Sequence, residues 1–211
     1  MISLATNYFR LAVACGLLVL STMVQAKSTD DVDAKLLQPD NLFPVVKMET
    51  NMGVILVELD RPKAPVTVDN FLKYVVTGGY DNTAFHRIIE GFVVQGGGMD
   101  EKYNSLDDTF GTITNEAGNG LLNDQYSIAM ARQAHPHSAG RQFYFNVDDN
   151  KSLDPGPRSW GYTVFGRIIE GEDVVEKMAE VATEFNADLS MQDVPVNTVI
   201  LRKATLLPPE A

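Results

Sequence analysis

The sequence predicts a mainly β domain, a barrel or a sandwich, whose open ends are covered by two helices. Short segments with strand-like alternation recur along the chain, separated by Gly, Asn and Pro, and only two segments show helical spacing. The composition suits one globular domain or at most two small ones. With 211 residues, 45% of them hydrophobic, the chain is long enough to bury a substantial core.

The first predicted element is a β-hairpin over residues 45–60, VVKMETNMGVILVELD. Its hydrophobic residues alternate on both sides of a turn at residues 50–53, which is typical of two strands joined by a tight turn. Pro62 and Pro65 end the hairpin, because proline cannot donate a ladder hydrogen bond. We therefore place the start of the domain near Val45.

Two helices are predicted. Apolar side chains recur at helical spacing in residues 66–76, and Gly78 and Gly79 end this helix. The second helix runs from Glu172 to about Thr183, and the acidic side chains of its first turn suit the helix dipole. The predicted buried faces are Val68, Phe71, Leu72 and Val75 in the first helix, and Val174, Val175, Met178 and Val181 in the second.

The remaining predicted elements are short strands. They are Phe85–Ile89, Phe92–Gly96, Ser127–Ala131, Gln142–Val147 and Tyr162–Ile168, followed after Pro195 by Thr198–Ala204. The sequence RIIEG occurs twice, at residues 87–91 and 167–171. The first copy joins two predicted strands, whereas the second leads from a strand into a helix. Because no further copy occurs at a fixed period, the echo does not indicate a repeat architecture.

The first 26 residues have the pattern of a secretory signal peptide. A short start with one cation, Arg10, precedes an apolar run at residues 11–20, and cleavage is predicted after Ala26. The run is short for a membrane span, so an uncleaved anchor is the less favoured alternative. The single cysteine, Cys15, lies inside the run instead of at its end, which disfavours a lipoprotein.

Residues 27–44 are predicted to form a flexible leader, residues 45–207 the domain and residues 208–211 a C-terminal tail. Loss of Arg10 with the signal peptide would change the formal charge from −11 to −12 and would leave no cysteine. We expect such an acidic chain to bind no nucleic acid and to form no stable association with membranes, because both select for clustered Lys and Arg. An exported domain without disulfides must rely on its core.

Common hydrolase motifs are absent, since the sequence contains neither G-x-S-x-G nor H-E-x-x-H. His135 and His137 flank a proline without further ligands nearby, which is more typical of an exposed loop than of a metal site, and we expect no metal and no cofactor. The run Gly96–Gly98 does not match a dinucleotide-binding loop. It indicates tight backbone packing or positive φ.

Arg87 is the charged residue with the most unusual surroundings. On strand alternation, Arg87 and Phe85 should share one face, as should Gln142 and Tyr144. An isolated arginine on an aromatic face is more often structural, held by a cation–π contact or a salt bridge. The accompanying amide and aromatic side chains favour a binding surface instead.

Four segments in order, FHRIIEGFVVQGGG, SIAMAR, RQFYFNV and LDPGPRSWGYTVFGRIIEG, resemble the cyclophilin family of peptidyl-prolyl isomerases. The similarity extends over roughly residues 45–207. The stretch ITNEAGNGL, the compact segment at residues 99–126 and the ending DVPVNTVILRKATLLP resemble the exported bacterial members. The resemblance implies a closed eight-stranded antiparallel β-barrel capped by two α-helices, with the site on its outer surface.

The resemblance implies that the chain accelerates the isomerisation of X-Pro bonds by favouring the twisted amide. Arg87 matches the family's catalytic arginine, whose guanidinium would donate a hydrogen bond to the twisted amide nitrogen. An acceleration of about 10⁵-fold requires about 7 kcal/mol, more than one such bond supplies, so binding of the proline must contribute. The resemblance implies a proline pocket formed by Phe92, Val93, Tyr144 and Leu153. Gln95 and Gln142 would bind the substrate and orient Arg87. Ala131 and the backbone of Arg132 would border the peptide groove, and Tyr162 stands where many members have histidine.

Three residues depart from the family pattern. Tyr144 replaces the usual phenylalanine at the pocket floor, so its hydroxyl needs a partner and turnover is expected to be reduced. Ser152 stands where many eukaryotic members have a tryptophan important for cyclosporin, so we expect weak cyclosporin binding. Glu90 replaces a common proline and should affect rigidity more than chemistry.

His86 is expected to point to the face opposite the arginine, with a structural role. Trp160 is expected to serve in packing.

The leading hypothesis is therefore a monomeric, exported prolyl isomerase that assists protein folding. Its partners would be proline-containing peptides and unfolded or folding proteins, in the periplasm, with full secretion left open. The alternative is a cyclophilin-like binding module or chaperone with little turnover, which Tyr144 keeps open. An unrelated β-barrel scaffold with a structural arginine would require the order of the motifs to be a coincidence.

Overall fold

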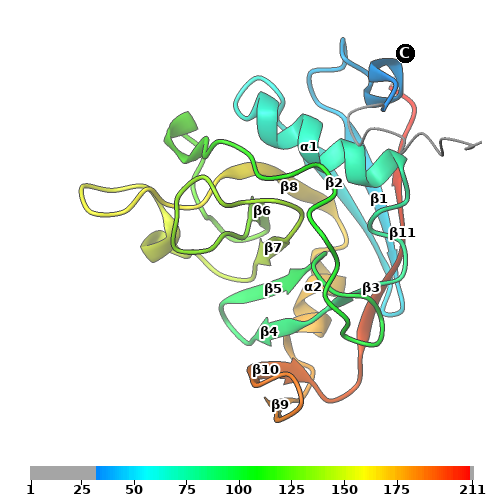
Figure 1. Cartoon of the computed structure of the whole chain (residues 1–211), viewed down its shortest axis with the longest axis vertical. Helices are drawn as coiled ribbons and strands as arrows, with labels where there is room; N and C mark the ends of the chain where they lie inside the picture. Colours follow the sequence, from blue (N-terminus) through cyan, green and yellow to red (C-terminus); the bar gives the residue numbers. More distant parts are fainter. Residues whose placement is uncertain (1–31, 210–211) are drawn as a thin grey trace, which may run out of the picture.

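The computed structural model describes residues 32–209 (Figure 1). The predicted signal peptide, its cleavage site after Ala26 and Cys15 lie outside the described residues, as do the last two residues of the predicted tail. None of the helices in residues 32–209 is both long enough and apolar enough to cross a membrane.

A nine-stranded antiparallel sheet forms the body of the domain. Its strands are β1 (Val45–Thr50), β2 (Val54–Leu59), β3 (Thr83–Phe85), β4 (Arg87–Ile89), β5 (Val93–Gly96), β6 (Ser127–Met130), β7 (Phe143–Asn146), β8 (Val164–Glu170) and β11 (Val199–Leu206). They pair in the order β3-β11-β1-β2-β8-β6-β7-β5-β4, so the two ends of the order are consecutive in the chain and separated by His86 alone. The sheet thus curves into a nearly closed barrel. If β3 and β4 are taken as two halves of one bent strand, the predicted barrel of eight strands is confirmed.

The β1–β2 hairpin is confirmed at the predicted place. In its turn, the backbone N–H and the hydroxyl of Thr50 both donate to the carbonyl of Gly53, each at 2.8 Å. Gly53 has φ +148°, and a Cβ at this position would lie 2.6 Å from the side chain of Val174. Glycine is therefore required here, because the turn packs directly against the second helix.

Helices α1 (Pro65–Val76) and α2 (Glu172–Ala179) cover the barrel (Figure 1). The predicted face of α1 is buried, and Glu116 accepts hydrogen bonds from the backbone N–H groups of Val66 and Thr67 at the helix N-terminus. Helix α2 begins where predicted but ends four residues before Thr183. Val181, predicted on the helical face, follows the helix and packs at the edge of the core.

A second hairpin, β9 (Thr183–Asn186) with β10 (Met191–Pro195), was not predicted. The predicted second helix extended into β9, and no strand was expected before Pro195. The side chains of residues 183–185 are exposed, so the hydrophobic alternation that marks a half-buried strand is missing here. Figure 1 shows this hairpin at the lower end of the molecule, beside β4, and residues of β10 and β4 are in contact.

The described part of the expected flexible leader packs on the domain. It includes a short 3₁₀ helix, Ala34–Leu37, with the side chain of Leu37 buried. The buried guanidinium of Arg61 donates to the carbonyls of Leu37 (2.6 Å) and Gln38 (2.8 Å). The side chain of Gln38 in turn donates to the carbonyl of Leu207 (2.7 Å), which ties the segment to the end of the barrel. The folded unit therefore includes residues before Val45.

Aromatic side chains form a connected cluster within the interior core. The ring of Phe71 from α1 lies 5.0 Å from that of Tyr80, 5.5 Å from that of Phe143 and 5.2 Å from that of Phe165. Phe143 also meets Phe145 edge to face. Such tilted and edge-to-face pairs add to the hydrophobic contribution of burial. They join α1 to β7 and β8, the strands whose outer face carries the predicted site.

Candidate active site

The strand register places three of the predicted site residues, Arg87, Gln95 and Tyr144, in one row on the outer face of the barrel. Arg87 is paired with Gln95, Gln95 with Tyr144, Tyr144 with Ala129, and Ala129 with Val164. Directly paired residues of antiparallel strands project from the same face. The neighbouring row, whose members lie in the interior core, consists of Ile88, Val94, Phe145 and Ile128.

A small apolar cluster lies on this outer face, separate from the interior core. Its buried members are Val93, Ala129, Tyr144 and Val164, and Phe92, Leu121, Ala131, Leu153 and Tyr162 pack around them. All four residues predicted to form the proline pocket, Phe92, Val93, Tyr144 and Leu153, belong to it. The ring of Tyr162 meets that of Tyr144 edge to face, with centroids 6.0 Å apart. The structure thus brings the pocket residues together from β5, β7 and the 3₁₀ helix Lys151–Leu153.

Arg87 does not share a face with Phe85, which corrects the prediction from alternation. Phe85 is buried in the interior core, because the chain bends at His86 between β3 and β4. Arg87 points outward and is about one-third exposed, with a side-chain exposure of 35%. Its Nε lies 3.6 Å from Oδ2 of Asp193, in the unpredicted hairpin. The guanidinium therefore stands at the edge of the apolar cluster with an acidic neighbour.

Gln95 and Gln142 are bonded to each other, with Nε2 of Gln95 donating to Oε1 of Gln142 at 3.0 Å. Among residues 32–209, neither amide forms a hydrogen bond with Arg87, so the expected orientation of Arg87 by these amides is not seen. Gly98 contributes to this arrangement, because a Cβ at its position would lie 2.5 Å from the Gln142 side chain. The tight packing predicted for the Gly96–Gly98 run is confirmed.

A small hollow of about 110 Å³ extends the site beyond the two amides. It is lined by Gln95, Asp108, Ala131, Arg132, Gln133, Ser138, Gly140 and Gln142. Arg132 was predicted to contribute only its backbone to the groove. Its guanidinium lies 4.5 Å from the centre of the Tyr162 ring, and its Nε donates to the carbonyl of Gly161 at 3.0 Å. The side chain therefore orients the Tyr162 ring.

The segment that carries these residues matches a known protein family. Residues 45–206 match the model of the cyclophilin type peptidyl-prolyl cis-trans isomerases. The chain belongs to this family. The matched segment contains every predicted site residue and all the strands of the barrel.

Curated relatives have the same activity in their names. The chain is 47% identical over 165 residues to a peptidyl-prolyl cis-trans isomerase of Streptomyces antibioticus, covering 77% of this chain and 98% of that one. It is 44% identical to peptidyl-prolyl cis-trans isomerase B of Escherichia coli, covering 77% and 99% of the two chains. Identity to peptidyl-prolyl cis-trans isomerase A of Dickeya dadantii is 42%, over 77% of this chain and 84% of the relative.

Solved structures share the fold. A cyclophilin type peptidyl-prolyl cis-trans isomerase of Cryptosporidium parvum superimposes with a TM-score of 0.65 at 23% identity, over 80% of this chain and 99% of that chain. The same protein in the presence of the dipeptide Ala-Pro gives a TM-score of 0.65 at 24% identity, over 78% and 99% of the chains. At this identity, the likeness supports the cyclophilin barrel.

The hydroxyl of Tyr144, a buried member of the apolar cluster, has a buried partner. It donates to Oδ1 of Asn123 at 2.7 Å, and Nδ2 of Asn146 donates to the same oxygen at 3.2 Å. Nδ2 of Asn123 in turn donates to Asp154 at 3.0 Å. Burial raises the pKa of the Tyr144 hydroxyl, so it stays protonated and acts as a donor.

Replacing Tyr144 with phenylalanine is expected to lower the free energy of unfolding by about 1 kcal/mol, because one buried hydrogen bond is lost while Asn146 still satisfies Asn123. Urea unfolding followed by fluorescence measures the change. Tyr162→Phe is the matched control, since no hydrogen bond of its hydroxyl is found in residues 32–209. Equal losses in the two variants would contradict the role of the Asn123 bond.

His86 has a structural place at the bend of this cyclophilin barrel. It is only 2% exposed, and its Nδ1 has no hydrogen-bond partner among the described residues. Burial lowers the pKa of His86 from 6.5 to about 4. The imidazole is therefore neutral near pH 7, and the prediction that His86 lies off the site face agrees with its burial.

Acidification is expected to destabilise the fold through His86. Between its unfolded pKa near 6.5 and its folded pKa of about 4, the unfolded chain binds the proton and the folded chain does not. The contribution of neutral His86 to the free energy of unfolding is therefore complete above the unfolded pKa. It is lost as the pH falls, by about 3 kcal/mol on reaching about pH 4. Urea unfolding at several pH values, compared with His86→Gln, measures this term. An identical pH dependence in the two proteins would contradict it.

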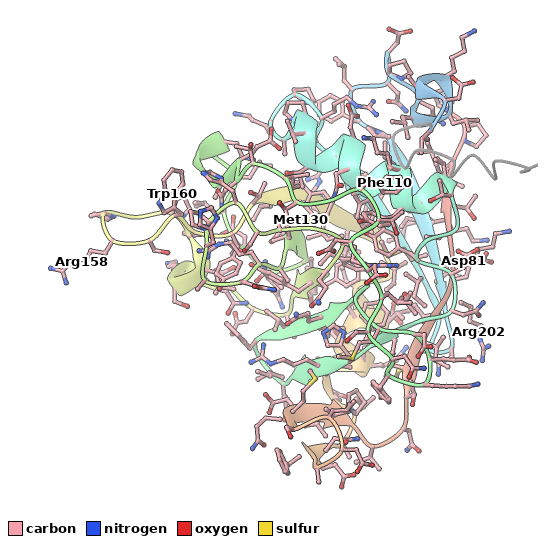
Figure 2. All side chains as sticks on the ribbon, in the orientation of Figure 1. Asp81, Phe110, Met130, Arg158, Trp160 and Arg202 are labelled. Carbon is pink, nitrogen blue, oxygen red and sulfur yellow. The ribbon has the colours of Figure 1, made fainter. Side chains whose placement is uncertain are left out.

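The histidine loop and Trp160 lie beside the site. His135 and His137 each use Nδ1 to accept a backbone N–H, from His137 and Asn115 respectively. In the part of the chain that the structure describes, no three acidic, histidine or cysteine side chains cluster as a metal would require. Trp160, predicted to serve in packing, is 60% exposed, and Figure 2 shows it with Arg158 on a protruding loop.

Arg141 is a buried residue that sequence reasoning missed. It is 5% exposed, and its guanidinium donates to the backbone carbonyls of Gly97 (2.6 Å), Asp107 (3.1 Å) and Gly79. It also lies 5.0 Å from the centre of the Tyr74 ring. Arg141 thus joins three loops directly beside Gln142. No local pattern could reveal this, because its acceptors are backbone groups of distant segments.

Proposed function

We propose that this chain accelerates X-Pro isomerisation with Arg87 as the catalytic group and the apolar cluster around Tyr144 as the proline pocket. One observation supports this assignment above the others. The strand register that pairs Arg87 with Gln95 and Gln95 with Tyr144 sets a cationic donor at the edge of an apolar pocket, on the outside of the barrel. Isomerisation needs such a donor and such a pocket, and it needs no nucleophile or cofactor.

The proposed mechanism is differential binding. Rotation about a peptide bond breaks the amide resonance, against a barrier of about 18–20 kcal/mol. The twisted nitrogen gains a lone pair, and a guanidinium N–H of Arg87 donates to it more strongly than to the planar amide. The proline ring is held meanwhile by Phe92, Val93, Leu153 and the Tyr144 ring. Holding the ring on one side of the bond lets the other side rotate.

The alternative function, a binding module with little turnover, is separated from this proposal by a rate measurement. In a protease-coupled assay with a short X-Pro peptide, the wild-type protein should exceed the uncatalysed rate in proportion to its concentration. A rate equal to the uncatalysed one, with the peptide still bound, would favour the module. The Cryptosporidium parvum relative in the presence of Ala-Pro supports short proline peptides as the probe.

We further propose that the clients are folding or surface-exposed proteins of the periplasm, on which the chain acts as a monomer. Support for export comes from the signal-peptide pattern of residues 1–26. Fractionation of cells followed by mass spectrometry tests this. The periplasmic fraction should contain a chain that begins at Lys27, whereas a chain that retains residues 1–26 in the cytoplasm would contradict export.

Cyclosporin is expected to inhibit only weakly, because Ser152 is a small, exposed side chain at the rim of the pocket. It cannot supply the apolar surface of the tryptophan that many eukaryotic relatives have there. Inhibition of the catalysed rate should require concentrations above about 100 nM. Half-inhibition at lower concentrations would show that Ser152 does not limit binding.

A further inference from the structure

The unpredicted β9–β10 hairpin delivers an acidic side chain to Arg87. The distance from Oδ2 of Asp193 to Nε of Arg87 is 3.6 Å. No other ion pair of Arg87 is found in residues 32–209. Strand β10 packs against β4, the strand that carries the arginine. The contact therefore joins two segments that are more than a hundred residues apart in the chain.

The backbone of β10 is shaped to make this contact. Its register with β9 shifts between Met191, paired with Asn186, and Val194, paired with Glu184. The extra residue of such a bulge bends the strand and redirects a side chain. Asp193 sits within the bulge at φ +60°, a left-handed conformation that Asp tolerates better than most residues.

The hairpin is anchored directly after the bulge. The side chains of Val194 and Pro195, directly after Asp193, are buried. The carbonyl of Pro195 accepts a hydrogen bond from the hydroxyl of Tyr103 at 3.5 Å. Asp193 is thus held at the site by a docked strand and does not reach it from a free loop.

The geometry leaves the reactive end of the arginine open. Asp193 approaches Arg87 from the Nε side, while Gln95 and Gln142 are bonded to each other and do not hold the guanidinium. The terminal nitrogens of Arg87 form no hydrogen bond within residues 32–209. They remain available to a bound peptide.

We propose that Asp193 is a positioning residue for Arg87. Its carboxylate restrains the guanidinium along the Nε edge, so that the terminal N–H groups face the proline pocket before substrate binds. This role rests on the proposed function of Arg87 as the donor to the twisted amide. Both side chains are about one-third exposed, so the restraint is modest and is screened by salt.

Enzyme kinetics test the role with a matched control. Asp193→Asn should lower kcat about threefold to fivefold and change KM by less than about twofold, the size expected for loss of a partly exposed ion pair. Asp188→Asn removes the same charge from the exposed turn of the same hairpin and should leave both constants unchanged. Raising salt from about 0.05 M to about 1 M should lower kcat of the wild type toward that of Asp193→Asn, with less effect on the variant.

A second measurement reports on Arg87 without turnover. The ¹⁵N-resolved NMR signal of the Arg87 Nε–Hε group, assigned by its loss in Arg87→Lys, should shift and become more mobile in Asp193→Asn but not in Asp188→Asn. An unchanged Nε signal, or a kcat of Asp193→Asn equal to or above that of wild type, would overturn the positioning role. If the wild type does not accelerate isomerisation while the Nε signal still responds, the proposed function fails and the pairing of the two side chains stands.

Discussion

Arg87→Ala is expected to lower kcat by about 100-fold, because a charge-assisted hydrogen bond to the transition state contributes up to about 3 kcal/mol. KM should change less, since the apolar cluster proposed to bind the proline ring does not include the guanidinium. Exchange NMR on a saturating X-Pro peptide measures the rate directly. The residual acceleration is expected to come from the pocket alone.

Two further variants sharpen this prediction. Arg87→Lys keeps the charge but loses the planar fork of donors, so its kcat should fall between those of wild type and Arg87→Ala. Arg202→Ala removes an exposed arginine from β11, away from the site (Figure 2), and should leave the rate unchanged. If kcat and KM fell together in Arg87→Ala and left kcat/KM unchanged, an effect on the transition state would be contradicted.

Arg141→Met is expected to lower the free energy of unfolding by about 3–4 kcal/mol. The methionine fills similar space but leaves the carbonyls of Gly97, Asp107 and Gly79 without their donor. Each unsatisfied buried group costs about 1–3 kcal/mol, and the partly exposed ones can be rescued by water. Urea unfolding gives the value, and kcat over KM should also fall because the loops around Gln142 lose their common anchor.

Arg158→Met is the control for this second prediction. Arg158 lies on the exposed loop that also carries Trp160, and no hydrogen bond or ion pair of its side chain is found in residues 32–209. Its replacement should change the free energy of unfolding by less than about 0.5 kcal/mol. Equal stability of wild type and Arg141→Met would show that water replaces the guanidinium at all three carbonyls.

The barrel could be predicted most directly where the side chains alternate between buried and more exposed positions, as they do in β1 and β2. The hairpin at residues 45–60 and the buried face of α1 illustrate this, since hydrophobic periodicity alone places them. Alternation failed at His86, where the chain bends between β3 and β4. The bend arises because β3 pairs with β11 while β4 pairs with β5. The local sequence does not indicate these distant pairings.

The site was predictable where its members lie on regular strands or in family motifs. Phe92, Val93, Tyr144 and Leu153 come together as expected. Asp193 and Arg141 could not be predicted, because a bulge in an exposed hairpin and a set of backbone acceptors leave no periodic signal. Their contacts exist only once distant segments of the chain have packed.

One NMR titration tests most directly whether this outer face of the barrel is a catalytic site. A short X-Pro peptide is added to protein with ¹³C-labelled methyl groups, and peptide exchange and protein shifts are recorded in the same sample. We expect accelerated cis–trans exchange together with shifts centred on the methyl groups of Val93, Ala131 and Leu153. Accelerated exchange with shifts confined to another face, or shifts at these residues without acceleration, would contradict it.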